Sequence, residues 1–293
     1  MSATVTSVAR RPLVGGTIDG LRDVAGHYEL LRMLVVKDLK IRYKASALGL
    51  FWSLLNPLLL MIVYSVIFGA VMRNPRPEFP IFILSGLLAW NFFGTAVPLA
   101  TIIVVANANL VKRTRFPISL LPISVVISGL INYLISLVLL FGLLVFYRHG
   151  VGPSIILLPV LILAQLLFTA GLGLLLSGLN VFFRDIEHFL GIAMTVWFFA
   201  TPIIYPRDAL QGKAASLIIQ VNPMTWLVGA YQDIFYGAAD STPSNGTIRY
   251  LGTFHSAWPN PRPVLGFMAL AIVLAVVGFT VFTGLSHRFP EEV

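Results

Sequence analysis

The sequence offers few groups that could perform catalysis. The nucleotide-binding pattern G-x-x-x-x-G-K-[ST] and the zinc-binding pattern H-E-x-x-H are both absent from it, and its five histidines are scattered. The chain has no cysteine, which excludes disulfides, thiolate ligands and a cysteine nucleophile. The cluster at a predicted membrane boundary that could supply an ionisable pair for catalysis comprises Arg184, Asp185, Glu187 and His188. We therefore predict no catalytic residue, no metal site and no ATP hydrolysis of the phosphate-loop kind on this chain.

A short basic segment from Asn107 to Pro117 is better suited to binding than to catalysis. Its Lys and Arg side chains could anchor the chain at the cytoplasmic membrane surface, as basic residues commonly do. The apolar residues on either side of the basic run favour a second interpretation, a short helix that docks on another protein. Both interpretations stay open at this point. The candidate residues are Asn109, Leu110, Lys112, Arg113, Arg115, Phe116 and Pro117.

Aromatic residues are abundant, with 21 Phe, 9 Tyr and 5 Trp. Most aromatic residues of membrane proteins form belts at the two interfaces or pack against lipid. The alternative is a channel wall, because aromatic faces give broad contact to the apolar C–H faces of sugar rings. The residues predicted for such a wall are Trp52, Tyr64, Phe68, Trp90, Trp197, Phe198 and Tyr205.

Long apolar segments must position these candidate residues. The chain is 57% hydrophobic and only 11% charged, whereas ordinary soluble domains are about 25% charged. Six charge-free runs are close to or above the ~20 residues with which a helix crosses a bilayer. In lipid the backbone must satisfy its hydrogen bonds within each segment, and the alternating ~10-residue segments of a β-barrel are missing.

We therefore predict an all-α integral membrane protein with six transmembrane helices. Small residues in the fourth helix, Gly171, Gly173, Ser177 and Gly178, predict the close approach of a neighbouring helix. The predicted spans are about 48–71, 80–106, 124–147, 153–180, 189–205 and 264–286.

The distribution of charge predicts the topology and the source of the driving force. No Asp, Glu, Lys or Arg lies inside the six predicted spans, although carriers coupled to ions or protons generally need such groups. We therefore expect another polypeptide to supply the energy. The formal charge is +8, and thirteen Lys and Arg lie on the side of the two termini against seven on the other. This bias predicts that both termini are cytoplasmic, and we expect no nucleic-acid partner.

The segment before the first span divides into two parts. Residues 1–26 lack the apolar region of a signal peptide, so we predict a flexible cytoplasmic tail. Residues 27–44 place apolar and basic residues on different sides of a helix, which predicts an amphipathic interface helix on the inner leaflet. A solvated helix is the alternative. The basic residues of this helix are Lys37, Lys40, Arg42 and Lys44. Residues 45–293 then form the membrane domain.

The segment between spans five and six is polar for a membrane protein. Residues 214–232 are free of charge, but Gln220 and the pair Asn222-Pro223 interrupt them, and Trp226 follows. A spanning helix would carry this proline near its centre, so we predict short re-entrant helices on the outer face instead. The remainder, from Tyr236 to Arg262, is rich in turn-forming residues and is predicted to be an external loop.

Five short motifs follow one another along nearly the whole predicted membrane domain. They are Arg42-Tyr-Lys-Ala-Ser-Ala-Leu-Gly49 with Leu-Phe-Trp52-Ser-Leu-Leu-Asn-Pro57, Asn109-Leu110 with Phe116-Pro117 and Leu121-Pro122, Phe183-Arg184-Asp185-Ile186, Thr201-Pro202-Ile-Ile-Tyr205-Pro206, and Asn222-Pro223-Met224. Each motif is weak alone. Together they resemble the permeases of ABC-2 type polysaccharide exporters.

The resemblance implies a division of labour between subunits. In that family two permeases form a dimeric channel in the bacterial inner membrane, and two separate ATP-binding cassette subunits bind ATP and Mg²⁺ beneath it. The permease itself holds no cofactor. The cargo is a lipid-linked polysaccharide such as O-antigen, teichoic acid or galactan.

The resemblance also implies roles for particular segments. The loop from Asn107 to Pro117 would be the coupling helix on the ATPase, and Arg184, Asp185 and Glu187 would form a second cytoplasmic contact. The helix at 27–44 would be the interface helix. The segment at 214–232 would supply the outer re-entrant helices, with Asn222, Pro223 and Trp226.

Two other functions stay open. The cargo could be a drug, a small lipid or a peptide, although exporters of those substrates often have larger external domains. A membrane-embedded lipid-modifying enzyme is the third hypothesis, and the cluster around Arg184 would have to supply its ionisable pair. Activity of the purified chain on a lipid, without any partner, would favour the enzyme.

Overall fold

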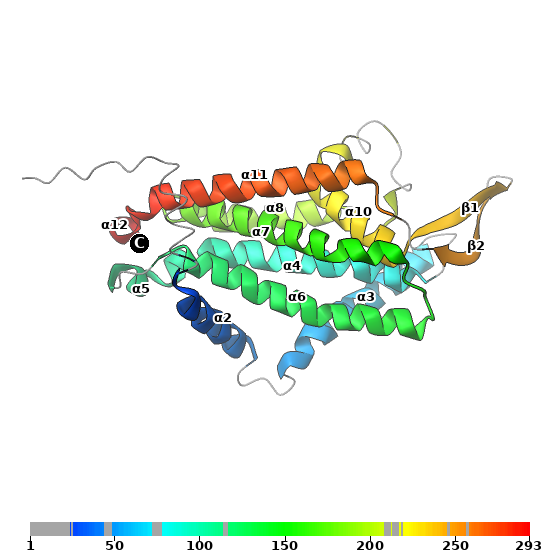
Figure 1. Ribbon diagram of the computed structural model, residues 1–293, viewed down its shortest axis with the longest axis horizontal. Helices are drawn as coiled ribbons and strands as arrows, with labels where there is room; N and C mark the ends of the chain where they lie inside the picture. The colour runs from blue at the N-terminus through cyan, green and yellow to red at the C-terminus, as the bar shows by residue number, and fades with distance from the viewer. Residues whose placement is uncertain are drawn as a thin grey trace, which may run out of the picture.

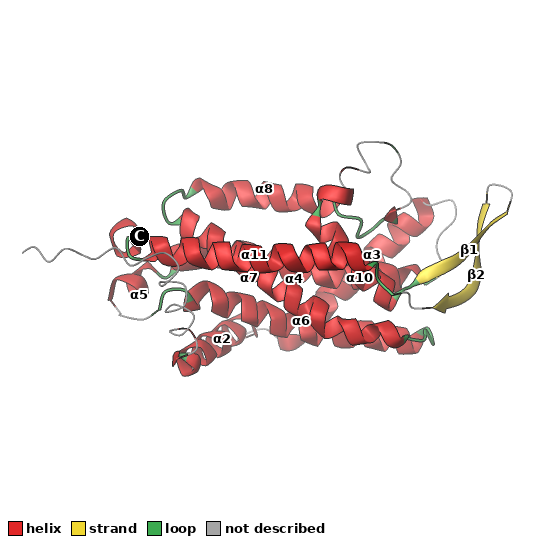
Figure 2. Ribbon diagram, turned by 45° about the horizontal axis from the view of Figure 1, so that its top comes forward, coloured by secondary structure: helices red, strands yellow, loops and turns green. Residues whose placement is uncertain are grey.

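The computed structural model is an elongated bundle of helices that run side by side along its long axis (Figures 1 and 2). It describes residues 24, 26–43, 49–71, 78–113, 117–207, 212, 217, 219–244, 247–255 and 258–293. Of the predicted tail at 1–26, only residues 24 and 26 are among them. The predicted boundaries of tail, interface helix and membrane domain stay predictions.

Within the described residues, five helical segments are long and apolar enough to cross a membrane. The chain is therefore a multi-pass helical membrane protein, as predicted. These helices correspond to predicted spans one to four and six, with ends that differ by a few residues. They are α3 (Trp52–Val71), preceded by η1 (Gly49–Phe51); α4 (Phe79–Ala106); α6 (Leu120–Phe146); α7 (Leu158–Asn180), preceded by η2 (Pro153–Leu157); and α11 (Pro261–Ser286).

The fifth predicted span corresponds to α8 (Asp185–Phe199), which has only 15 residues. At about 1.5 Å per residue this helix is ~22 Å long, which is less than the ~30 Å hydrocarbon core. The helix begins and ends a few residues before the predicted range 189–205, and the limits of the span itself stay a prediction. The helix begins earlier because Asp185 and Glu187 lie in its first turn, where the helix dipole favours acids. It ends before Pro202, because a proline disfavours helical geometry in the residue that precedes it.

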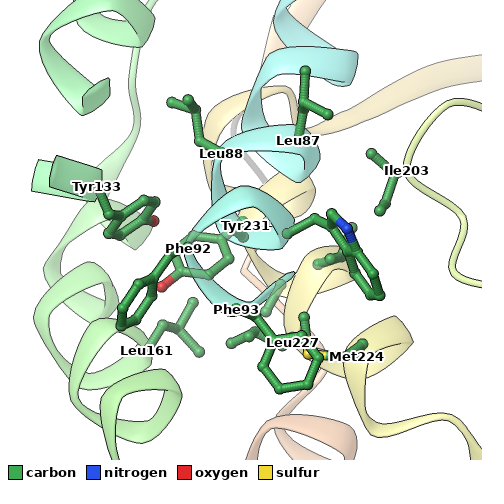
Figure 3. Packing of buried hydrophobic residues seen from close by; sticks show 14 of the residues in the cluster. Leu87, Leu88, Phe92, Phe93, Tyr133, Leu161, Ile203, Met224, Leu227 and Tyr231 are labelled. Atoms are coloured by element: carbon green, nitrogen blue, oxygen red, sulfur yellow. The ribbon is translucent and has the colours of Figure 1, made fainter. Parts of the chain in front are cut away.

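Helix α4 lies at the centre of the bundle. Every residue from Ile81 to Trp90 is buried, so this part of the helix is covered on all sides. A helix that is apolar all round belongs in the interior of a helical assembly. Figure 3 shows Leu87, Leu88 and Phe93 of this helix among side chains of α6, α7 and α10 (Pro223–Phe235). The core therefore forms around α4, and the other helices cover it.

Helices α7 and α11 pack closely through glycines. An ideal Cβ on Gly171 would lie 2.5 Å from the carbonyl carbon of Leu274, and one on Gly278 would overlap the carbonyl of Gly171. No residue with a side chain fits at either position without moving a backbone. Gly173 leaves similar space for Ala100 of α4. The predicted close approach at the small residues of the fourth span is confirmed.

The two ends of the bundle differ. Helices α2 (Tyr28–Tyr43), α5 (Ala108–Arg113) and α12 (Phe289–Glu292) lie at one end with the C-terminus (Figure 1). The opposite end carries an antiparallel hairpin, β1 (Ala238–Ser244) and β2 (Thr247–His255), in which Ser244 pairs with Thr247. We call these the helical end and the hairpin end.

The hairpin bears on two predictions. The segment predicted only as an external loop contains two paired strands between Ala238 and His255, and the all-α prediction holds for the membrane helices but not for this segment. The signal was present in the sequence, since the Asn-Gly pair at 245–246 is a strong two-residue hairpin signature. Residues 245 and 246 themselves lie outside the described residues.

Helix α2 lies obliquely against α6 (Figure 1). Val35 is buried in this contact, whereas Met33 and Ile41 are 60% and 64% exposed. Lys37 and Lys40 are exposed, and Arg42 pairs with Asp38 at 2.9 Å. Lys44 lies outside the described residues. The helix at 27–44 is confirmed as a helix, and its place on the inner leaflet stays a prediction.

Candidate functional site

An aromatic cluster joins three helices, α3, α4 and α8. Tyr64 of α3 and Trp90 of α4 both approach Phe198 of α8, with ring centroids 6.2 and 5.5 Å away. Trp197 lies 6.4 Å from Trp90, and Phe68 lies 6.5 Å from Tyr64. The structure thus brings together five of the seven aromatic residues predicted for a channel wall, although their role in transport stays a prediction.

The other two predicted aromatics lie elsewhere. Trp52 is 49% exposed in the first turn of α3, and its Cα is twelve residues, or ~18 Å along the helix, from Tyr64. Tyr205 follows the end of α8, and its hydroxyl donates a 2.6 Å hydrogen bond to the carbonyl of Phe199. This hydrogen bond stabilises the turn that follows α8, because it joins Tyr205 to the last residue of the helix.

A groove of about 260 Å³ opens beside the cluster. It lies between α3, α4 and α8, and Tyr64, Trp90 and Phe198 form part of its wall. Gly94 also lines it, and an ideal Cβ there would lie only 2.9 Å from the indole nitrogen of Trp90. Glycine therefore lets the indole lie along α4. We call this feature the aromatic groove.

Polar residues that the sequence interpretation missed also line the aromatic groove. Asn91 of α4 and Thr195 of α8 are among its lining residues, and Thr95 lies one turn after Asn91. Both threonine hydroxyls donate to a carbonyl of their own helix, as Thr95 does to Asn91 at 2.6 Å. A search for neutral polar residues, and not only for ionisable ones, would have found them. Among the described lining residues none is charged.

Asn222 links the aromatic cluster to α10. Its side-chain oxygen caps α10 by accepting from the Met224 amide at 2.9 Å, and it also accepts from the indole N–H of Trp197 at 2.8 Å. Its amide nitrogen donates to the Ala200 carbonyl and to the Thr201 hydroxyl. Pro223 occupies the first turn, where its missing N–H has no cost. Trp197 and Asn222, which the sequence analysis assigned to different sites, are thus in contact where α8 and α10 meet.

The predicted coupling loop contains α5. Asn109 and Lys112 are exposed, Leu110 and Pro117 are half-buried, and Val111 is buried against the apolar cluster that includes Phe289. Helix α12 contacts α5, a contact that no sequence pattern indicated. The side chain of Arg113 and the whole of Arg115 and Phe116 lie outside the described residues. The loop presents exposed polar residues on a short, supported helix.

The second predicted cytoplasmic contact is exposed as well. Arg184, Asp185 and Glu187 stand at the start of α8, at the helical end of the bundle. From Asp185 to Thr195 is ten residues, about 15 Å along the helix. These groups therefore cannot act on a molecule in the aromatic groove. Trp226 was predicted together with Asn222. Its side chain lies against Gly266 of α11 and not at the junction that Asn222 forms.

The fold and the groove define a multi-pass membrane bundle with an uncharged polar and aromatic surface groove. A family model described as ABC-2 type transporter matches residues 29–236, and the chain belongs to this family. Membership implies an ATP-binding partner and a membrane location. It also agrees with the predicted absence of a catalytic site on the chain, because this family consists of transport permeases.

Curated relatives cover almost the whole chain. The O-antigen export system permease protein RfbA of Myxococcus xanthus is 35% identical over 274 residues, which are 93% of this chain and 98% of the relative. A protein of the same name from Klebsiella pneumoniae is 34% identical over 90% of this chain and 95% of its own length. The polysialic acid transport protein KpsM of Escherichia coli is 23% identical over 67% of this chain and 76% of its own.

Proposed function

We propose that the chain is the membrane subunit of an ABC exporter that moves a lipid-linked polysaccharide across the bacterial inner membrane. The observation that carries this proposal is its likeness, at 35% identity over 93% of its length, to a permease named for O-antigen export. Among the three cargoes implied by the sequence motifs, this likeness favours the O-antigen type over teichoic acid or galactan.

The aromatic groove supports a sugar cargo. Aromatic faces contact the C–H surface of successive sugar rings, while the Asn91 amide exchanges hydrogen bonds with sugar hydroxyls and the Thr195 hydroxyl accepts them. Because the groove lies open between α3 and α8, we infer that a second copy of the permease closes it into a channel.

The helical end supplies the contacts with the ATP-binding subunits. We infer that α5 is the coupling helix and that Arg184, Asp185 and Glu187 form a second contact on the same face. Two partner subunits would hold the ATP and Mg²⁺. Their closure on nucleotide shifts the permease between conformations, which requires contacts that differ between the two states. Lys37, Lys40 and Arg42 of α2 would lie at the headgroups of the same leaflet.

This arrangement determines the proposed topology. The helical end, with both termini, is cytoplasmic, and the hairpin end faces outward. We infer that α8 and the turn after it complete a sixth crossing. Residues 214–232, whose described part includes the start of α10, would enter the outer leaflet and return.

Deletion of the gene in its own bacterium tests the function. We expect loss of surface polysaccharide and accumulation of a lipid-linked glycan on the cytoplasmic side, restored by the wild-type chain. An ATP-binding cassette protein should co-purify with the tagged chain. Normal surface glycan in the deletion strain would refute polysaccharide export, and a purified chain that acted on lipid unaided would indicate the enzyme instead.

A further inference from the structure

A second cavity, separate from the aromatic groove, lies near the start of α11 at the hairpin end. It has a volume of about 210 Å³ and is formed by the turn after α8, by α10 and by the start of α11. Its polar lining residues are Arg207, Gln220, Thr225, Asp233 and Asn260, and Trp226 provides an aromatic wall. We call it the outer cavity.

An ion pair forms one side of the outer cavity. Arg207 Nη2 lies 3.4 Å from Asp233 Oδ1, and the two side chains are 39% and 30% exposed. Gly229 lies one turn before Asp233, and a Cβ there would overlap the Arg207 guanidinium. The guanidinium therefore lies directly on the backbone of α10, where only glycine leaves room for it. This packing holds a cation beside a carboxylate at the cavity wall.

The ion pair leaves hydrogen-bonding capacity for a ligand. A guanidinium has five N–H donors and a carboxylate has about four acceptor positions, and one 3.4 Å contact uses few of them. Thr225 borders the same cavity and is 2% exposed, and its hydroxyl has no hydrogen-bond partner within the described part of the chain. Because that hydroxyl oxygen is shielded from solvent, we expect the ligand's hydrogen bonds to come from the partly exposed Arg207 and Asp233.

The aromatic wall and the volume narrow the choice of ligand. Trp226 lies over Gly266, where an ideal Cβ would be in ordinary van der Waals contact with the indole at 3.4 Å. A cavity of 210 Å³ is smaller than the ~300 Å³ lower bound of drug-sized pockets, so it suits a single ring. Asp233 disfavours an anion such as phosphate, and an acyl chain would have to cover the Arg207–Asp233 ion pair without offering it a hydrogen bond, which is costly. An uncharged ring with several hydroxyls and one apolar face fits all of these features.

We propose that the outer cavity binds one uncharged pyranose ring of the exported polysaccharide as the chain leaves the permease. Asp233 accepts hydrogen bonds from ring hydroxyls, Arg207 donates to ring oxygens, and Trp226 packs against the C–H face. This inference rests on the proposed function for the identity of the cargo. The cavity gives the polymer a contact on the outer side that is independent of the aromatic groove.

Saturation-transfer NMR on the full chain in phosphatidylcholine nanodiscs tests the proposal. Glycoside detergents are removed beforehand, because their sugar headgroups would occupy the site. The probes are the methyl pyranosides of glucose, galactose, mannose and rhamnose, with inorganic phosphate followed separately by ³¹P line broadening. We expect saturation transfer to at least one pyranoside. Transfer to none of them, or broadening of phosphate alone, would overturn the proposal.

Variants localise the binding. Asp233→Asn should reduce the transferred saturation at least fivefold, and Gln220→Ala, an exposed position that tolerates truncation, should reduce it at least twofold. Glu291→Gln neutralises an exposed acid in α12 and should leave the signal unchanged. Thermal unfolding in the same nanodiscs establishes that each variant is folded. An unchanged signal in both Asp233→Asn and Gln220→Ala would refute the site.

The two proposals fail in different ways. If the deletion strain loses surface polysaccharide but no pyranoside binds the purified chain, the outer cavity is refuted and the export function stands. If a pyranoside binds and Asp233→Asn abolishes the signal while surface polysaccharide is unaffected by the deletion, the cavity stands and polysaccharide export is refuted.

Discussion

Two regions of the bundle differ in how closely they are packed. One is the contact between α7 and α11, and the other is the edge formed by α3 and α8. At the first, two glycines bring backbones together, and Phe267 and Ala271 of α11 are fully buried. At the second, Val66 of α3 is 66% exposed, and Ile192 and Val196 of α8 are 68% and 64% exposed. The first contact buries its side chains within one chain, whereas the second leaves apolar side chains exposed.

This difference indicates how the bundle separates stability from function. Without a hydrophobic driving force in lipid, close backbone contact is a main source of helix association. The tightly packed helices hold α4 in place, and the aromatic groove lies on the sparsely covered side of α4. We expect a permease that alternates between conformations to use such a loosely packed edge. Four predictions test whether the two regions have these separate roles.

The largest effect is expected from Gly171→Leu. Its side chain would overlap the backbone of α11, and overpacking of this kind costs about 3 kcal/mol or more where a backbone must move. We expect loss of the folded protein in fluorescence-detected size-exclusion chromatography. Gly142→Leu is the matched control, because nothing lies within 4 Å of its Cβ position. Equal yields of the two variants would contradict the assigned role of the α7–α11 contact.

Arg113→Glu should abolish coupling without affecting folding. We expect the basic segment around α5 to meet acidic residues of its partner, so the reversed charge would oppose a like charge at a cost of several kcal/mol, enough for at least a tenfold loss of surface polysaccharide. Normal membrane insertion should accompany this loss, together with reduced co-purification of the ATP-binding subunit. Arg148→Glu, exposed after the other end of α6, is the control. Wild-type export by Arg113→Glu would exclude α5 as the coupling helix.

Tyr64→Ala should slow export without unfolding the chain. An aromatic contact contributes about 0.5–1.5 kcal/mol, so the rate should fall about fivefold, whereas Tyr64→Phe keeps the ring and should stay within twofold. Pulse-labelled appearance of surface glycan measures the rate. Phe146→Ala, at a 79% exposed position, is the control. A loss as large in Tyr64→Phe would assign the effect to the hydroxyl and not to the aromatic face.

The smallest effect is expected from Asn222→Ala, at the junction of α8 and α10. Loss of an N-cap costs about 0.5–2 kcal/mol, which lowers Tm by a few degrees in a chain of this size. Asn222→Asp keeps the oxygen that accepts from Met224 and Trp197, so it should recover part of the loss. Equal Tm values for Asn222→Ala and the wild type would show that the junction is not held by this side chain.

Predictability differs between the spans and the sites. Long apolar runs such as 80–106 were predicted within a residue of α4, because hydrophobic length is a property of one segment. The helix at the fifth predicted span ends earlier than its apolar run, because Pro202 and Tyr205 belong to a turn and not to the helix. The hairpin was missed because its Asn-Gly signal lay in a segment judged only by its turn-forming composition.

For the candidate sites, the sequence predicted which types of residue would take part but not how those residues are arranged in space. Tyr64, Trp90 and Phe198 were proposed together only because they are aromatic, and nothing in the sequence indicated that their rings would meet. Asn91 and Thr195 were missed because neutral polar residues are unremarkable in a span until a groove forms beside them. The support of α5 by Phe289 joins segments almost 180 residues apart and has no local signal.

The sequence by itself determined that this chain crosses a membrane several times as helices, that its spans carry no charge, and that small residues line its fourth span. These features depend on the composition of a segment and on the spacing of residues within it, so each segment determines them independently of the others. Only the tertiary structure decided which faces of α3, α4 and α8 form the aromatic groove, and that Arg207 lies on Gly229 beside Asp233. Such contacts depend on the rotation and depth of each helix, and these are determined by packing between segments that are distant in the chain.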